Sequence, residues 1–327
     1  MPAPSVGDEQ PRPAAMSSDL LVRLPNHLGD ACMALPALDL LAARGHSLTL
    51  AGRPWAAELF AGYPWPVLCL PRERAARVAA LRRRVRSGTR ALLLTNSFGS
   101  ALELRLAGLR STGYRTDLRS ALLAEAVPVP VRWRRADEPM HMVEYYYQLA
   151  GALADHAPAV PRDLSLRLPP AAAERARAML EAAGVGSAFV MLCPVAVGLH
   201  RGRVKAWSGF GALCADLVER GMQVAACPGP GEQEAVRAAV PGAIVLPETD
   251  LGTFAALLAA SRLVLANDSG AAHVAAAVGA PLITLFGVTD ARRTGPWSSI
   301  AVRLGSAEAW PSFDEVAAAV RAKLERP

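Results

Sequence analysis

The chain has 327 residues, of which 52% are hydrophobic and 20% are charged, so it can bury a sizeable core and is not disordered throughout. Its 35 Lys and Arg against 29 Asp and Glu give a formal net charge of +6, which permits an anionic partner but does not indicate nucleic acid. The five cysteines are odd in number and form no C-x-x-C pair, which argues against a disulfide framework or zinc knuckle and fits a reducing cytoplasm.

Residues 1–18 are rich in Pro, Ala and Ser and include acidic residues. They lack the basic region and the apolar region of a secretory signal, so we predict a disordered tail. Elsewhere the apolar stretches are interrupted by Arg, Asp, Asn or Pro before they reach the ~20 residues that a spanning helix requires. The sequence therefore predicts a cytoplasmic protein without a transmembrane segment.

Short apolar runs alternate with helical segments from residue 20 onward. The predicted strands of the first half cover residues 20–25, 47–52, 67–71 and 91–97. The predicted helices between them cover residues 29–45, 56–63 and 72–87. Strands separated by helices of this length predict βαβ units and a parallel sheet.

The second half repeats this alternation. Its predicted strands cover residues 189–195, 222–228, 243–248, 262–268 and 281–287. Its predicted helices cover residues 171–184, 209–221, 231–240, 253–261, 271–279 and 315–325. Dense proline at 161–170 places the boundary between a domain of residues 19–160 and one of residues 161–327, and we expect the last helix to pack back on the first domain. Two doubly wound α/β domains place ligands in a cleft beyond the strand ends.

The loop after the first strand carries Gly29 and Asp30 at the start of a helix. Gly29 permits close approach of a ligand, and the helix start offers N–H donors to an anion. Asp30 has two interpretations, a helix-capping carboxylate or a general base that faces the cleft.

Two loops of the second half could contact a nucleotide. The loop 193–210 carries four cationic or titratable side chains: His200, Arg201, Arg203 and Lys205. Cations beside a helix start suit a diphosphate, although a solvated basic loop has the same composition. The turn 227–236 holds two carboxylates, of which Glu234 is preferred over Glu232 as a ribose contact; both are also ordinary first-turn acids.

The stretch 263–287 is the most informative in the chain. A strand leads into Asp268, Ser269 and Gly270 at a helix start, where backbone N–H groups and a hydroxyl suit a phosphate. Asp268 could bind sugar hydroxyls or cap the helix. His273 lies one turn inside, where it could reach the ligand or be an ordinary core histidine.

Two further pairs suggest contacts with a hydroxyl-rich ligand. Asn96 and Ser97 lie at a strand-to-helix turn, where they suit sugar hydroxyls or simple capping. His141 and Glu144 have i, i+3 spacing without a third ligand, which favours a surface pair or acceptor contacts over a metal site. The absence of G-x-S-x-G, Walker A and H-E-x-x-H sequences argues against serine hydrolases, P-loop NTPases and zincins.

Together these motifs resemble the ADP-heptose:lipopolysaccharide heptosyltransferases, glycosyltransferase family 9. The segments that carry the resemblance are Gly29-Asp30 with ALPAL, NSFGSAL (96–102), TGYRTDLR (112–119), HMVEYY (141–146), Lys205-Ala206-Trp207 and NDSGAAHVAAAVGAPLITLFG (267–287). The similarity spans about residues 20–300, and NSFGSAL and HMVE look closer to the enzymes that add the second heptose.

The resemblance implies a glycosyltransferase-B fold, in which two Rossmann-like domains face a cleft. It implies inverting transfer, without metal or other cofactor, from ADP-L-glycero-β-D-manno-heptose to a lipopolysaccharide inner-core acceptor held by the first domain. Asp30 becomes the base and Lys205 neutralises the leaving diphosphate. The implied donor contacts are Gly29, Glu234, Asp268, Ser269, Gly270 and His273. The implied acceptor contacts are Asn96, Ser97, His141 and Glu144.

Three other interpretations remain open at this point. The chain could use another donor or acceptor within the family, or bind a sugar nucleotide without catalysis. A nicotinamide oxidoreductase is disfavoured because the G-x-G-x-x-G sequence and its ribose acid are missing. The arginine-rich stretches 81–90 and 131–135 are either a solvated face or a contact with the anionic cytoplasmic face of the inner membrane.

Overall fold

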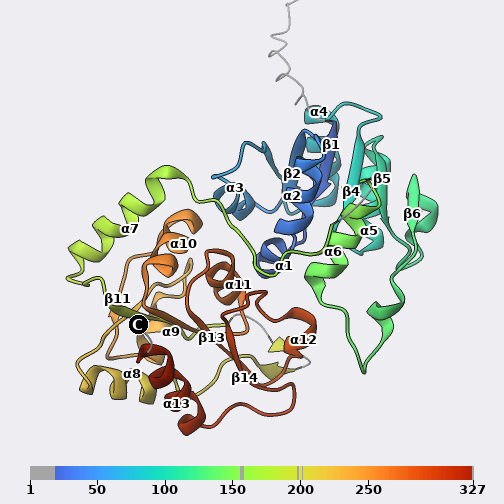
Figure 1. Cartoon of the computed structure of the whole chain (residues 1–327). Helices are drawn as coiled ribbons and strands as arrows, with labels where there is room; N and C mark the ends of the chain where they lie inside the picture. The colour runs from blue at the N-terminus through green and yellow to red at the C-terminus, as the bar shows by residue number, and fades with distance from the viewer. Residues whose placement is uncertain (1–18, 155–157, 197–198, 201, 326–327) are drawn as a thin grey trace, which may run out of the picture.

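A computed structural model describes residues 19–154, 158–196, 199–200 and 202–325 as two α/β halves, each built on its own sheet (Figure 1). The tail predicted for residues 1–18 lies outside the described residues. The domain boundary at residue 160 stays a prediction, and the two sheets lie on either side of it in the chain.

The first sheet has six parallel strands in the order β3-β2-β1-β4-β5-β6. In chain order these are β1 (Leu20–Arg23), β2 (Leu48–Gly52), β3 (Val67–Cys69), β4 (Arg90–Leu93), β5 (Arg110–Tyr114) and β6 (Glu125–Val127). The helices of this half are α1 (Leu28–Met33), α2 (Leu35–Ala43), α3 (Trp55–Leu59), α4 (Arg74–Arg84), α5 (Phe98–Leu106) and α6 (Met142–Gly151), with 3₁₀ turns at Arg119–Leu122 and Val131–Arg134. Leu20 of β1 pairs with Leu48 on one side and Arg90 on the other, so β1 is central.

The second sheet repeats the arrangement in the order β11-β10-β7-β12-β13-β14, again all parallel. Its strands are β7 (Phe189–Cys193), β10 (Gln223–Ala226), β11 (Ile244–Val245), β12 (Leu263–Asn267), β13 (Leu282–Phe286) and β14 (Val302–Gly305). Its helices are α7 (Pro170–Ala182), α8 (Phe210–Glu219), α9 (Gln233–Ala239), α10 (Leu251–Ala260), α11 (Gly270–Ala277), α12 (Ala291–Thr294) and α13 (Phe313–Leu324). A small antiparallel pair joins β8 (Leu199–His200) to β9 (Arg203–Val204).

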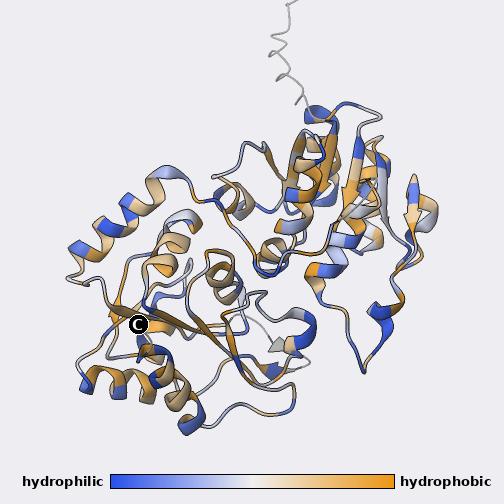
Figure 2. Cartoon of the chain, viewed as in Figure 1, coloured by the Kyte–Doolittle hydropathy of each residue, from blue (hydrophilic) through white to orange (hydrophobic). Residues whose placement is uncertain are grey.

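The strands are apolar because helices cover both faces of each sheet. β1, β7, β12 and β13 are buried along their whole length, as expected of a parallel sheet. Figure 2 shows the strands largely in orange, with blue on the outward faces of helices such as α7. One apolar cluster runs from α1, α2 and α6 of the first half to α10 and α11 of the second, so the two halves share a core.

The predicted strands are all present. The structure differs from the prediction in one divided helix and three additional strands of the two large sheets, and each difference has a local cause. The helix predicted at 29–45 is interrupted at Ala34, because Pro36 has no N–H for the carbonyl of residue 32. β5, β6 and β14 escaped prediction because they are short or polar, with Ser111 and Thr112 inside β5.

The last helix differs from the prediction as well. α13 does not return to the first half: its buried residues Val316, Ala317 and Val320 pack in the core of the second sheet. A connection of seven residues after β14, 306–312, returns the chain directly onto that sheet. In the described part of the chain, no helix is long and apolar enough to cross a membrane.

Candidate functional site

A cavity of about 930 Å³ lies where the strand ends of the two halves meet. Residues 27–30 at the start of α1 line one side of it, and the loops that follow β7, β10 and β12 line the other. Its polar lining includes Asp30, Lys205, Asp268, Ser269 and His273. The structure thus brings together both predicted catalytic residues and five predicted donor contacts, since Gly29 and Gly270 also line the cavity.

The starts of α1 and α11 form one of the contacts between the two halves, and the two helices lie side by side in Figure 1. A Cβ atom on Gly29 would lie 2.5 Å from Cδ2 of His273. A Cβ on Gly270 would lie 3.0 Å from Cδ2 of Leu28. The two glycines therefore permit one helix start to lie directly against the other, with the candidate site beside the contact.

Asp30 is not a helix cap. His27 occupies the N-cap position of α1, and the half-buried Asp30 lies in the first turn, where its carboxylate has no hydrogen bond or ion pair to a described residue. Burial raises the pKa of its carboxyl, the nearby Asp268 raises it further, and His27 and Lys205 oppose the rise. A carboxylate with a raised pKa and no partner is suited to accept a proton from a ligand.

Lys205 and Asp268 form an ion pair on the second half, with 3.7 Å between Nζ and Oδ2. Asp268 is buried after β12, and its Oδ2 accepts a 2.6 Å hydrogen bond from the Thr289 hydroxyl. Nε2 of His273 lies 3.9 Å from the other carboxylate oxygen. Thr289 thus fixes Asp268 between the lysine and the histidine, a role that the sequence alone did not indicate.

The start of α11 leaves two buried polar atoms unused. Within the described residues, neither the Ser269 hydroxyl nor Nδ1 of His273 has a hydrogen-bond partner. Burial lowers the pKa of His273 against the opposing effect of Asp268, so the ring is neutral near pH 7 and can donate one N–H. Buried polar atoms without partners beside a helix start suit an anionic ligand.

Asn267 holds the Lys205 loop in place, and it was not among the predicted site residues. Its side chain is fully buried at the end of β12. Its Oδ1 accepts a hydrogen bond from the backbone N–H of Trp207 at 2.9 Å, and its Nδ2 donates to the Pro194 carbonyl at 2.7 Å. Asn267 therefore joins both ends of the loop 194–207 to the strand that carries Asp268. The signal available was its position directly before Asp268.

The other basic residues of the loop 193–210 do not line the cavity among the described residues. Arg203 donates to the carbonyls of Gly287 and Ala307, so it braces the loop. Arg201 and the side chain of His200 lie outside the described residues.

The carboxylate that lines the cavity after β10 is Glu232, and not the preferred Glu234. Glu234 is exposed in the first turn of α9. Glu232 accepts a 3.1 Å hydrogen bond from the backbone N–H of Gly229, which also lines the cavity. Pro228, Val236 and Phe254 add apolar lining nearby, as a nucleobase would require.

The predicted acceptor contacts do not line the main cavity. His141 and Glu144 form the capping box of α6, in which His141 accepts from the N–H of Val143 and Glu144 from the N–H of His141. Nε2 of His141 also lies 2.9 Å from the Gly295 carbonyl of the second half. These contacts give both residues a structural role, and their contact with an acceptor stays a prediction.

Asn96 and Ser97 also have protein partners. Oδ1 of Asn96 accepts from the Tyr145 hydroxyl at 3.1 Å. Ser97 is the N-cap of α5, and its hydroxyl accepts from the N–H of Ser100. Ser97 also lines a second cavity in the first half. In the part of the chain that the structure describes, no group of three His, Cys, Asp or Glu side chains is arranged to hold a metal ion.

Comparisons with known proteins identify a family that the chain matches and relatives that share its fold. A model of glycosyltransferase family 9 (heptosyltransferase) matches residues 78–322. Lipopolysaccharide heptosyltransferase 3 of Escherichia coli is 36% identical over 148 residues, which are 42% of this chain and 42% of the relative, so the match spans less than half of that protein.

Two solved structures share the fold. The ADP-heptose heptosyltransferase II of E. coli has 24% identity and a TM-score of 0.73 over 93% of this chain and 98% of that one. The E. coli heptosyltransferase WaaC with ADP has 20% identity and a TM-score of 0.71 over 93% and 99%. These likenesses confirm the expected glycosyltransferase-B architecture.

Proposed function

The chain belongs to glycosyltransferase family 9, and we propose that it transfers a heptose from ADP-L-glycero-β-D-manno-heptose to a hydroxyl of a lipopolysaccharide inner-core acceptor. One observation carries the proposal. An unpaired carboxylate from the first half and a cation with an anion-binding helix start from the second half line the same cavity. Inverting transfer by direct displacement requires these two functions on opposite sides of the anomeric carbon.

Asp30 acts as the base in this proposal. The acceptor hydroxyl attacks the anomeric carbon, and its proton passes to the Asp30 carboxylate as the new glycosidic bond forms. Burial of Asp30 raises its pKa, which strengthens it as a base. The acceptor therefore enters on the α1 side of the cavity.

The leaving diphosphate takes the electron pair of the broken bond, and the second half stabilises its charge. Lys205 moves from Asp268 to the diphosphate, or bridges both, because it lines the cavity and its Nζ lies 3.7 Å from Asp268. The Ser269 hydroxyl, the N–H groups at the start of α11 and the neutral His273 ring supply hydrogen bonds to the phosphates. Asp268 engages the donor, and Glu232 replaces Glu234 as the proposed ribose contact.

ADP is expected to stabilise the purified protein against thermal unfolding, whereas UDP, GDP, CMP and NAD at equal excess are not. A ligand at ~100 times its dissociation constant adds about 2.7 kcal/mol to the free energy of unfolding. For a chain of 327 residues, this corresponds to a shift of about 4 °C, since the entropy of unfolding is about 2.1 cal/mol/K per residue. Ser269→Ala should reduce the ADP shift. A larger shift with UDP or GDP would overturn the heptose donor, and a preference for NAD would favour an oxidoreductase.

Contact with an anionic membrane surface is a further part of the proposal. α4 ends in Arg82, Arg83 and Arg84, beside a groove of about 730 Å³ whose apolar lining includes Val78 and Leu106. Cations around apolar side chains complement the anionic headgroups of a cytoplasmic leaflet. A protein seated in this way would meet a lipid-linked acceptor at the membrane.

Reversing two charges on α4 is expected to weaken binding to phosphatidylglycerol vesicles at least tenfold, because each cation near an anionic surface contributes about 1 kcal/mol. The variant is Arg83→Glu with Arg84→Glu, two exposed residues, and the measurement is co-sedimentation. Arg177→Glu on the exposed face of α7 is the matched control. Unchanged co-sedimentation of the double variant would contradict the proposed contact.

A further inference from the structure

α3 of the first half forms part of the wall of the main cavity. It contributes Trp55 and Glu58, which stand at i and i+3 and therefore on one face of the helix. α10 of the second half contributes Leu251 and Phe254, which are again spaced i and i+3. The two helices contact each other and lie side by side in Figure 1. This end of the cavity is therefore walled by both halves.

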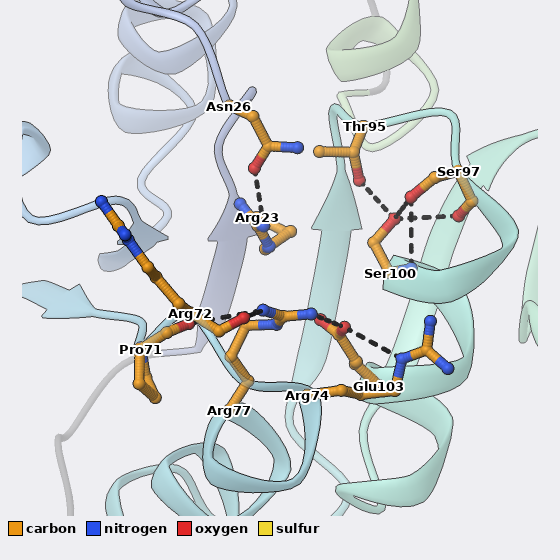
Figure 3. A network of polar contacts seen from close by, with 10 residues as sticks. All are labelled: Arg23, Asn26, Pro71, Arg72, Arg74, Arg77, Thr95, Ser97, Ser100 and Glu103. Carbon is orange, nitrogen blue, oxygen red and sulfur yellow. Dashed lines mark hydrogen bonds and ion pairs between the residues drawn. The ribbon is translucent and has the colours of Figure 1, made fainter.

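A hydrogen bond joins the two helices across the halves. Oε2 of Glu58 accepts from the backbone N–H of Leu251 at 3.0 Å. That N–H lies in the first turn of α10, where it has no carbonyl partner within the helix and where the helix dipole favours a carboxylate. The buried Glu103, by contrast, binds Arg77 within the first half (Figure 3). Glu58 is therefore a bridge between the halves.

The polar groups of the cavity set the order of the donor's parts. In the proposed complex the diphosphate lies at Lys205 and the start of α11, and the ribose lies at Glu232. Val236 follows Glu232 by one turn at the start of α9 and lines the cavity together with Phe254. A nucleobase beyond the ribose therefore occupies this apolar part, because ligand sites place rings against apolar and aromatic side chains.

Two aromatic side chains line the cavity, and they come from opposite halves. Among the described residues of the lining, Trp55 and Phe254 are the only Phe, Tyr or Trp. Both are half-buried at the edge of the apolar cluster that the halves share, so part of each ring remains accessible from the cavity. Stacking on an aromatic ring holds a base without hydrogen bonds to its edges.

We propose that Trp55 covers the nucleobase of the donor from the first half, with Phe254 on the other side of the base. The inference rests on the proposed function for the presence of a nucleoside diphosphate in the cavity. Trp55 is then a specificity-determining residue, because a purine presents two fused rings to the indole and a pyrimidine only one. Glu58 is a positioning residue, since its hydrogen bond to Leu251 holds the face of α3 that carries Trp55 against α10.

The test is calorimetric titration of the full chain with ADP and, separately, with inorganic pyrophosphate, which resembles the leaving diphosphate but has no base. Trp55→Leu keeps an apolar side chain and removes the aromatic face. This variant should bind ADP roughly 5- to 150-fold more weakly than wild type, the loss typical of an unstacked base. It should bind pyrophosphate as wild type does. Trp55→Phe should retain most of the ADP affinity.

Tryptophan fluorescence gives a second measurement, which does not depend on the folding of Trp55→Leu. ADP should quench the emission of the wild-type protein, because the base contacts the indole of Trp55. Trp55→Phe keeps a ring at the same position and should lose that part of the quenching. Equal quenching in wild type and Trp55→Phe would contradict the contact.

Variants of Glu58 test its positioning role. Glu58→Ala should weaken ADP binding and leave pyrophosphate binding unchanged, because it frees α3 without removing a phosphate contact. In a Trp55→Leu background the same change should have no further effect, since the two residues act on one contact. Glu58→Gln, whose amide oxygen can still accept the N–H of Leu251, should keep the wild-type affinity. Additive losses would overturn the positioning role.

Trp133→Leu is the matched control, because Trp133 is a half-buried tryptophan of the first half that does not line the main cavity; its ADP affinity should equal that of wild type. Equal ADP affinity in wild type and Trp55→Leu, or an equal loss of ADP and pyrophosphate, would overturn the inference and leave the ADP donor standing. UDP binding that depends on Trp55, without ADP binding, would refute the ADP donor alone. A protein that binds no nucleoside diphosphate would refute both.

Discussion

Asp30→Asn should lower the rate of heptose transfer by about 10²–10⁴-fold, because positioned general bases typically contribute that much. The change keeps the size of the side chain and removes its ability to take the acceptor proton. ADP binding should be unaffected, since Asp30 is not among the proposed ADP contacts. The measurement is kcat for transfer from ADP-heptose, together with the ADP-induced thermal shift of the same variant.

The pH profile provides a second test of the base. Burial and Asp268 raise the pKa of Asp30, so the carboxyl keeps its proton at pH values where an ordinary aspartate is ionised. Wild-type kcat/KM should therefore rise with pH as Asp30 loses this proton, and Asp30→Asn should lack that limb. Asp39→Asn, which makes the same change on α2 outside the cavity, is the control and should retain both rate and profile. Full activity of Asp30→Asn would remove Asp30 as the base.

Lys205→Met should lower kcat by about 10²–10³-fold, because the variant loses the cation proposed to stabilise charge on the departing diphosphate. Asp268 retains its hydrogen bond from Thr289, so the loss should fall on the chemical step more than on folding. The measurement is kcat with saturating donor and acceptor. Product inhibition by ADP should also weaken, since the same cation is proposed to hold the product.

The chain has only one other lysine, which makes a matched control available. Lys323 lies on α13 and donates to the Ile300 carbonyl, away from the cavity. Lys323→Met should keep the wild-type kcat. If Lys205→Met raised only KM for the donor and left kcat unchanged, Lys205 would be a binding residue without a part in leaving-group stabilisation.

The predicted fold followed from the apolar strand runs, because strands buried on both faces must be almost wholly apolar. The same reasoning failed for β5, where Ser111, Thr112 and Gly113 break the apolar run although Ser111 and Thr112 are buried. Pro36 is visible in the sequence, but only the structure shows that it divides one predicted helix into two. Local rules thus identify an element more reliably than they place its ends.

The site was predictable where a single loop contains the chemistry, as in residues 268–273. It was not predictable where the function depends on side-chain direction or on distant partners. Glu232 and Glu234 have the same residue type two positions apart, and only the backbone of the turn decides which one lines the cavity. The hydrogen bonds of Asn267 join residues 60 and 73 positions away, which no spacing rule indicates.

The contact between α1 and α11 has a consequence for how this enzyme could be tuned. The proposed base and the proposed leaving-group contacts belong to different sheets, so neither half contains a complete reaction centre. Their separation depends on how the two halves pack against each other, for example where Gly29 lies against His273 and Gly270 against Leu28. Small rotations of one half against the other would then change the distance between the base and the leaving-group contacts, and with it the rate of the chemical step. A substitution far from the cavity could alter turnover simply by tilting one half against the other.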